Sequence, residues 1–298
     1  MNKLKSTRYN PAVKKTVLRL KMKNSLWIIS ICLMLISCEK NPFSNTKISP
    51  ETRSIKGTIR LADEANPAGT YIWLEQYNIA TRADASGDFT LKIPPSLRGG
   101  SASGTFNVYF YMANYLIDSA KVAIRNDAVI FGEEDVNGKG NLILPSPLQK
   151  FLNVTTTTSP QRLSQKSVST VTITTDLSAM KDSVTVVIPS SYSGGPLGIV
   201  FMREIETNNI FVFHALTTFQ ASELALVTVV PKSKALTFNF ANFPIPQGKY
   251  EIIPFLYPSH QKLPQGLLDS FGEFAFQPGI YFLNIPFERD YTVFEVTE

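Results

Sequence analysis

Residues 71–95 read YIWLEQYNIATRADASGDFTLKIPP and contain short apolar runs that alternate with polar residues. Within residues 89–93, phenylalanine, leucine and isoleucine occupy every other position, which is the period of a strand with one buried face. The segment Asp84-Ala85-Ser86-Gly87-Asp88 precedes this run and is rich in turn-forming residues, and Pro94-Pro95 ends it. The stretch therefore predicts short strands separated by tight turns.

The same pattern continues through most of the chain. Apolar residues at the three-to-four spacing of an amphipathic helix are scarce. Further runs that we expect to be strands lie at residues 55–61, 106–112, 121–124, 128–131, 141–144, 168–174, 184–188, 199–205, 210–216, 224–230, 236–240, 250–257, 274–276, 281–285 and 291–296. We therefore predict an all-β fold made of β-sandwiches.

An ordered set of glycine, proline and apolar residues runs through the first of these strands. Its members are Gly57, then Pro67 and Gly69, then Ile72-x-Leu74, then Thr81-x-x-Asp84-x-x-Gly87-x-Phe89-x-Leu91. This order resembles the carboxypeptidase regulatory-like and transthyretin-like domains. The resemblance implies a seven-stranded, immunoglobulin-like sandwich over residues 54–148, of a kind that usually accompanies another activity. The Gly/Ser-rich insertion Ser96–Ser103 departs from the family pattern.

A second sandwich is expected over residues 149–298, after a boundary near Pro145–Pro147. A faint repeat supports it, because an alternating strand followed by a Gly-x-aromatic strand occurs at 89–110 and again at 236–255. Glycine in such a turn accepts a positive φ, and the aromatic residue can fill the sandwich. Ordinary strand composition can produce the same similarity between two segments without a true repeat. Asn208-Asn209 predicts a hairpin within this half.

The segment before the strands is of a different kind. Residues 21–24 are positive and polar, residues 26–36 are apolar, and Leu35-Ile36-Ser37 leads into Cys38. About a dozen apolar residues fit the ~7–15 of a cleavable signal and fall short of the ~20 that span a membrane. The pattern resembles a bacterial lipoprotein signal, which implies lipidation of Cys38 and cleavage before it. An ordinary secretory signal is the alternative, but Leu35 stands where it would place a small residue.

We therefore expect a signal peptide at residues 1–37, with translation starting at Met1 or Met22. Residues 38–53 would comprise the lipidated Cys38 and a flexible stalk, because they are short, polar and poor in aliphatic residues. Two or more acyl chains hold a protein durably on a bilayer. The expected location is the bacterial cell envelope, on the periplasmic or surface face of the outer membrane.

Removal of the leader changes the charge and the cysteine content. Residues 1–37 carry eight Lys or Arg and no Asp or Glu, so a full-chain charge of +5 becomes about −3 with 21 basic and 24 acidic residues. A nucleic-acid partner is not expected, because phosphate binding needs a retained basic surface. The two cysteines are Cys32, in the leader, and Cys38. No free thiol, disulfide or thiolate metal ligand would remain.

Residues for catalysis or metal binding are few. The two histidines, His214 and His260, lack the paired spacing of a zinc site, and solvent exposure is the preferred interpretation of both. Sequence patterns for a nucleophile elbow, a phosphate loop or a dinucleotide site do not occur. We expect no catalytic residue, no metal site and no cofactor.

The segment 133–140 contains a partial calcium-loop pattern. Asp135, Asn137 and Gly140 fit positions one, three and six, but Lys139 stands where an oxygen ligand belongs and Ser146 replaces the final glutamate. An ordinary Asn-Gly turn is the preferred interpretation.

Aromatic residues provide the strongest candidate for binding. If Ile72 and Leu74 face the core, Tyr71, Trp73 and Tyr77 face the other way, and the same argument applies to Tyr109 and Tyr111 in the strand 106–112. Exposed ring clusters mark binding surfaces for sugars or proteins. Alternatively, these rings pack against the second domain, the insertion or a neighbouring loop.

The sequence thus predicts a membrane-anchored envelope lipoprotein that acts as a non-catalytic binding or structural module. Its partners would be the membrane, through the lipid on Cys38, and a glycan or another envelope protein. Two alternatives stay open. One is an envelope enzyme of the glycoside hydrolase type with two facing carboxyl groups. The other is an accessory subunit of an outer-membrane secretion or uptake complex.

Overall fold

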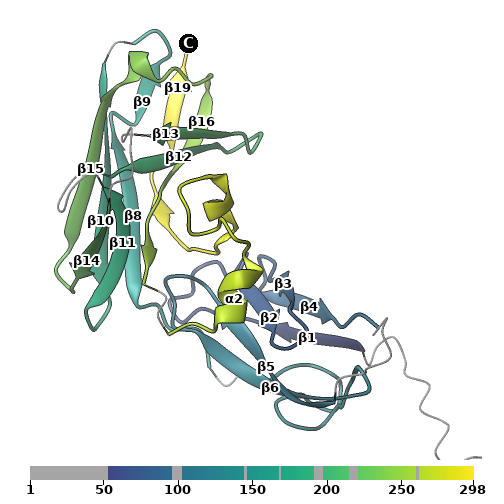
Figure 1. Ribbon diagram of the computed structural model, residues 1–298. Coiled ribbons are helices and arrows are strands. Elements are labelled where there is room, and N and C mark those ends of the chain that lie inside the picture. Colours follow the sequence, from purple (N-terminus) through teal and green to yellow (C-terminus); the bar gives the residue numbers. More distant parts are fainter. Residues whose placement is uncertain are drawn as a thin grey trace, which may run out of the picture. The chain divides into compact units, whose positions relative to one another are not determined.

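The structure, a computed structural model, describes residues 53–95, 103–143, 146–167, 169–190, 197–214, 221–259 and 262–298. The predicted signal peptide, Cys38, nearly all of the predicted stalk and His260 lie outside the described residues. The described residues form strands in five sheets with one short α-helix. The all-β prediction is therefore confirmed (Figure 1).

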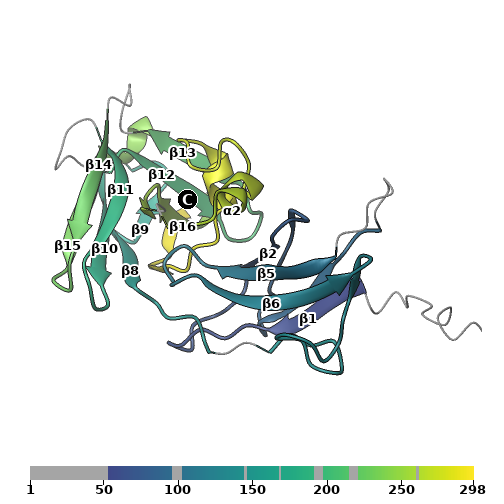
Figure 2. The same ribbon diagram turned by 60° about the horizontal axis from the view of Figure 1, so that its bottom comes forward.

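The first half of the described chain is a β-sandwich. Its strands are β1 (Ser54–Thr58), β2 (Tyr71–Leu74), β3 (Ile79–Arg82), β4 (Asp88–Lys92), β5 (Gly104–Tyr111), β6 (Asp118–Arg125) and β7 (Ala128–Val129). β1 and β4 pair as one sheet, and the others form a second sheet in the order β3-β2-β5-β6-β7. Ile55 and Leu91 from the first sheet pack with Val108 and Phe110 from the second in a shared core. Figure 2 shows β1 in a separate layer from β5 and β6.

Two glycines let β4 approach β1 closely. Gly87 has φ +83°, and a Cβ at this position would lie 2.1 Å from the carbonyl oxygen of Ile59, whose N–H donates to the Gly87 oxygen at 2.8 Å. Gly57 leaves room for the ring of Phe89, which would lie 2.7 Å from a Cβ there. Both positions exclude a larger residue on steric grounds.

The second half contains the remaining strands. They are β8 (Leu152–Ser159), β9 (Arg162–Ser164), β10 (Thr170–Ala179), β11 (Val184–Ser190), β12 (Ile199–Glu204), β13 (Ile210–His214), β14 (Ala221–Val227), β15 (Lys232–Asn239), β16 (Gly248–Pro254), β17 (Tyr257–Pro258), β18 (Asp290–Tyr291) and β19 (Phe294–Thr297). The sheet orders are β15-β10-β8-β18, β14-β11-β17 and β13-β12-β16-β19-β9. Inward residues from all three sheets, such as Ile173, Val186 and Val200, form one core. β12 and β13 pair antiparallel around Asn208, at φ +60°, which confirms the predicted hairpin.

Three short helical elements complete the second half: η2 (Phe240–Asn242), α2 (Gln265–Ser270) and η3 (Ile280–Asn284). The last two belong to residues 262–289, which we call the connecting segment because it joins β17 to β18. The predicted strands at 274–276 and 281–285 are wrong, since turns and η3 occupy these positions. Gly272, at φ +98°, and Pro278-Gly279 interrupt the chain on either side of the first run, so neither run is long enough to pair in a sheet.

The connecting segment supplies a third apolar cluster. Leu267, Phe271 and Phe282 pack there with Trp73 and Tyr111 of the first half, and the cluster also contains Ile199, Phe201, Ile253 and Phe255 of β12 and β16. The sheet containing β12 is thus covered by apolar residues on both faces. Within the described ranges, no helix has the length and apolar character needed to span a membrane.

Candidate functional site

The strongest candidate site is built on the hydrogen-bonding pattern of β1. Just after β1, the Ile59 N–H donates to the carbonyl of Gly87, just before β4, at 2.8 Å, and this bond continues the register in which Thr58 lies opposite Asp88. In an antiparallel ladder, hydrogen-bonded and non-hydrogen-bonded pairs alternate. The odd-numbered residues of β1 therefore bond to β4, while Lys56 and Thr58 direct their N–H and C=O groups to the opposite side.

On that opposite side, two backbone hydrogen bonds join β1 and its continuation to Leu142 and Leu148. The Leu142 N–H donates to the Lys56 carbonyl at 2.7 Å, and the Leu148 N–H donates to the Arg60 carbonyl at 2.9 Å. Residues 144 and 145, between Leu142 and Leu148 in the sequence, lie outside the described residues.

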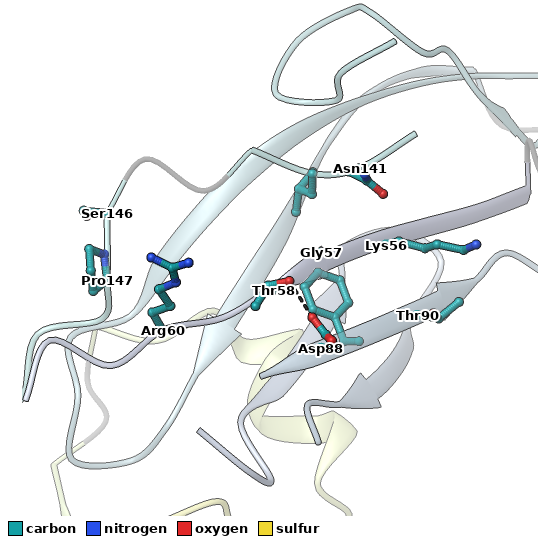
Figure 3. A pocket seen from close by; sticks show the side chains of 11 residues that line it. Lys56, Gly57, Thr58, Arg60, Asp88, Thr90, Asn141, Ser146 and Pro147 are labelled. Carbon is teal, nitrogen blue, oxygen red and sulfur yellow. Dashed lines mark hydrogen bonds between the residues drawn. The ribbon is translucent and has the colours of Figure 1, made fainter. Parts of the chain in front are cut away.

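A pocket of about 570 Å³ opens beside Thr58. Figure 3 shows Thr58 and Asp88 meeting in the middle of the pocket, with Lys56 and Arg60 on either side of them and Asn141 across from β1. The remaining lining residues are Gly57, Phe89, Thr90, Leu142, Ser146 and Pro147. Phe89 and Leu142 are buried and form an apolar floor, whereas the charged and hydroxyl side chains are exposed.

The charges of the pocket are arranged by strand alternation. Lys56, Thr58 and Arg60 lie on one face because they are two residues apart. The Thr58 hydroxyl donates to Asp88 Oδ1 at 2.5 Å, so one oxygen of the single lining carboxylate is already engaged. Asp88 is itself placed by the turn before it, since its N–H donates to Asp84 Oδ1 at 3.0 Å. The pocket therefore presents two cations, hydroxyl groups and one engaged carboxylate around an apolar floor.

The five predicted aromatic residues do not form one group. β2 and β5 pair so that Tyr71 lies opposite Tyr111 and Trp73 opposite Tyr109, and the structure brings these four together. Tyr77 lies elsewhere: its hydroxyl donates to Asp127 Oδ1 at 2.9 Å and its ring packs against the core of the first sandwich.

The four clustered rings are covered by the connecting segment. Trp73 is 4% exposed and Tyr111 is 5% exposed. The Phe271 ring centroid lies 4.6 Å from that of Tyr71 and 5.4 Å from that of Tyr111. Burial raises the pKa of Tyr111 above its usual range. This arrangement corresponds to the alternative in which the rings pack against the second domain, and ligand binding by these residues stays a prediction.

Polar contacts also join the two halves. The Asp63 and Glu288 carboxylates each lie 2.7 Å from Lys150 Nζ, and the Tyr115 hydroxyl donates to Asp63 at 2.9 Å. Partial burial acts to raise the pKa of Asp63, but the hydrogen bonds from Lys150 and Tyr115 outweigh it and hold that pKa below its usual value. Arg82 Nη1 donates to the Gly69 carbonyl at 3.0 Å, and Nη2 of the same side chain donates to the Asn284 carbonyl.

The partial calcium-loop residues have other roles. Asn137 Oδ1 accepts the N–H groups of Lys139 and Asn141 at 2.9 and 3.0 Å, and Asp135 Oδ2 accepts the Lys121 N–H at 2.7 Å. These bonds are typical of a side-chain-capped turn. Across the described part of the chain, no group of three or more His, Cys, Asp or Glu side chains could hold a metal ion. His214 lies on β13.

The pocket at Thr58 was not predicted from the sequence. The alternation Lys56-x-Thr58-x-Arg60 indicates a polar strand face but does not report which distant residues lie beside it.

Comparisons with known proteins give little further guidance. No protein-family model and no curated protein matches the chain. Two solved structures show a weak likeness. The TIE protein of Bacillus anthracis has 13% identity and a TM-score of 0.21, covering 67% of this chain and 28% of its own. The major pilin subunit of Bacillus cereus has 10% identity and a TM-score of 0.22, covering 67% of this chain and 64% of its own. TM-scores this low do not establish a common fold and indicate no function.

Proposed function

We propose that this protein is a lipid-anchored protein of a bacterial cell envelope, in the outer membrane, whose folded part is a non-catalytic binding or structural module. The first sandwich would be an immunoglobulin-like domain of the carboxypeptidase regulatory-like kind. The pocket at Thr58 is the observation that carries the binding role, because it combines an apolar floor of Phe89 and Leu142 with the charged side chains of Lys56 and Arg60. The leader that ends at Cys38 supports the anchor.

The glycoside-hydrolase alternative is less well supported by the described residues. Its general acid needs a raised pKa and a second carboxyl group facing it. Asp63 and Glu288 do meet, but they do so across Lys150, and the pKa of Asp63 is lowered. This arrangement suits an ion-paired brace, since a nearby cation favours the charged carboxylate.

The anchor can be tested with the full chain expressed in a Gram-negative host. Intact mass of the membrane-extracted protein should show a chain that starts at Cys38 and carries acyl groups. The Cys38→Ser variant should lose radiolabelled palmitate and leave the membrane fraction. A chain that keeps residues 1–37 or stays unacylated would contradict the proposal. Separation of inner and outer membranes on a density gradient then tests the location.

A further inference from the structure

We propose that Phe274 and Tyr281, in the connecting segment, form a platform that binds a single glycan chain by stacking against its pyranose rings. This inference goes beyond the proposed function, because it assigns a ligand class to a surface that shares no described residue with the pocket at Thr58. The first observation is exposure. Phe274 is 48% exposed, Tyr281 is 55% exposed and Ile280 is 53% exposed. The centroids of the two rings lie 6.0 Å apart.

The chain next to each exposed ring is anchored in the apolar core. Ala275 and Phe282 follow Phe274 and Tyr281 in the sequence, and both are fully buried. The Phe282 ring stacks on Phe201 of β12, with the centroids 5.9 Å apart. Backbone hydrogen bonds of 3.1 Å close the turns that carry the rings. The rings are therefore held in place before a ligand arrives, which lowers the entropic cost of binding.

The size of the patch favours a small ligand over a protein. An aromatic side chain can bury about 150–250 Å², so the three half-exposed side chains offer on the order of 300 Å². A stable protein–protein interface buries about 800 Å² on each partner. A second copy of this chain, or another protein, would need more contact area than these side chains provide, whereas a few sugar residues would not.

The charge of the segment argues against an acidic ligand. Between Lys262 and Arg289 the sequence contains no lysine or arginine and has acidic residues at 269, 273 and 288. Arg82 reaches the segment from β3, but its guanidinium already donates to the carbonyls of Gly69 and Asn284. Nucleic acids and anionic bilayers both need cations near the contact surface.

The geometry of the rings matches a neutral sugar chain. The C–H groups on the face of a pyranose ring are weakly positive, and they fit the negative face of an aromatic ring. The two ring planes are inclined by 38°, so one flat ligand ring cannot cover both, whereas successive residues of a sugar chain can. Glu273 and Gln277 are exposed and close to Phe274 in the sequence, and they offer carboxylate and amide groups to sugar hydroxyls.

The test uses the full chain, extracted from membranes in lauryldimethylamine oxide, because sugar-based detergents would compete for the platform. Isothermal titration calorimetry with chitohexaose, cellohexaose and maltohexaose measures binding and compares the sugar unit and its linkage. Saturable binding of at least one hexasaccharide is expected. Phe274→Ala and Tyr281→Ala should each weaken it about tenfold, since each removes one stacking face.

Two further substitutions at Tyr281 separate ring stacking from apolar contact. Tyr281→Phe keeps the ring and should retain the affinity within about threefold. Tyr281→Leu keeps apolar bulk but has no aromatic face, so it should bind as weakly as Tyr281→Ala. Tyr291→Ala is the matched control, because Tyr291 is 43% exposed and lies on β18, outside the connecting segment. It should bind as the wild type does.

Three outcomes would overturn the assignment. They are the absence of saturable binding with all three hexasaccharides, binding that the two alanine variants or Tyr281→Leu leave unchanged, and a dimer that Phe274→Ala dissociates in analytical ultracentrifugation. The last would mark the patch as a contact between copies of the chain. None of them bears on the anchor, which the mass of the chain at Cys38 tests separately.

Discussion

Asn114 and Glu288, separated by 174 residues, exchange two hydrogen bonds: the Asn114 side-chain amide donates to the Glu288 carbonyl at 2.9 Å, and Asn114 Oδ1 accepts the Glu288 N–H at 3.1 Å. The same amide donates to the Leu152 carbonyl at 3.1 Å, and Asn114 is fully buried. One side chain therefore satisfies backbone groups at the start of β8 and at the end of the connecting segment. It joins the first half of the chain to the second.

Replacement of Asn114 with Ala should lower the free energy of unfolding by about 2–4 kcal/mol, because buried backbone groups lose their partners. Urea denaturation, followed by circular dichroism, measures this change. Asn141→Ala is the control, since Asn141 is exposed, and it should change stability by less than about 0.5 kcal/mol. Equal losses in the two variants would refute a bracing role for Asn114.

The Asp63–Lys150 ion pair predicts how stability depends on pH. The pKa of Asp63 in the folded protein lies below its unfolded value of 3.8. The stabilisation from this carboxylate is therefore fully present above pH 3.8 and is lost as the pH falls through the folded-state pKa. Thermal unfolding between neutral pH and acid should show Tm falling more steeply for the wild type than for Asp63→Asn.

A variant at Lys150 tests whether the ion pair with Asp63 causes the loss of stability in acid. Lys150→Met removes the cation that contacts both Asp63 and Glu288, so it should flatten the acid limb of the profile as well as lower stability at neutral pH. If Asp63→Asn and the wild type have parallel profiles in acid, Asp63 does not carry the pH dependence.

The sequence predicted most of the strands but not their assembly. Alternation at residues 89–93 and 106–112 predicted β4 and β5, because each has one face on the core of its own sandwich. The outward face of β2 was predicted as an exposed aromatic surface, with packing against another part of the chain as the alternative, and Trp73 is buried. Its cover comes from Leu267 and Phe271, almost 200 residues later, and a local pattern does not report contacts at that separation.

The connecting segment also shows that a local sequence pattern does not report distant contacts. The aromatic runs at 274–276 and 281–285 have strand composition, and strand propensity largely reflects packing against neighbours. Here the rings do not share one buried face: Phe282 is buried and stacks on Phe201 at 5.9 Å, whereas Phe274 and Tyr281 are exposed. The pocket at Thr58 was equally hidden, since its lining residues come from segments that are distant in the sequence, such as Lys56–Arg60 and Asn141–Leu142.

Trp73 offers an optical probe of the packing between the halves. Trp27, the other tryptophan, lies in the predicted leader, so a processed chain would contain Trp73 alone. Phe271→Ala should destabilise the protein by about 3–5 kcal/mol and shift the Trp73 emission to longer wavelength, because it removes a buried ring from the same cluster. Phe274→Ala is the matched control, since Phe274 is 48% exposed. A red shift of the same size in that control would show that the probe does not report this contact.

The turn before β4 allows backbone strain to be separated from steric clash. Gly69 and Gly87 have nearly the same φ, +82° and +83°, but a Cβ meets nothing within 4 Å at Gly69 and lies 2.1 Å from the Ile59 carbonyl oxygen at Gly87. Gly69→Ala should therefore cost only the left-handed conformation, about 1–2 kcal/mol. Gly87→Ala should cost more than about 3 kcal/mol, because β1 must also move away from the turn. Urea denaturation of both variants gives the comparison. Equal costs would mean that the approach of Gly87 to Ile59 is looser than these distances indicate.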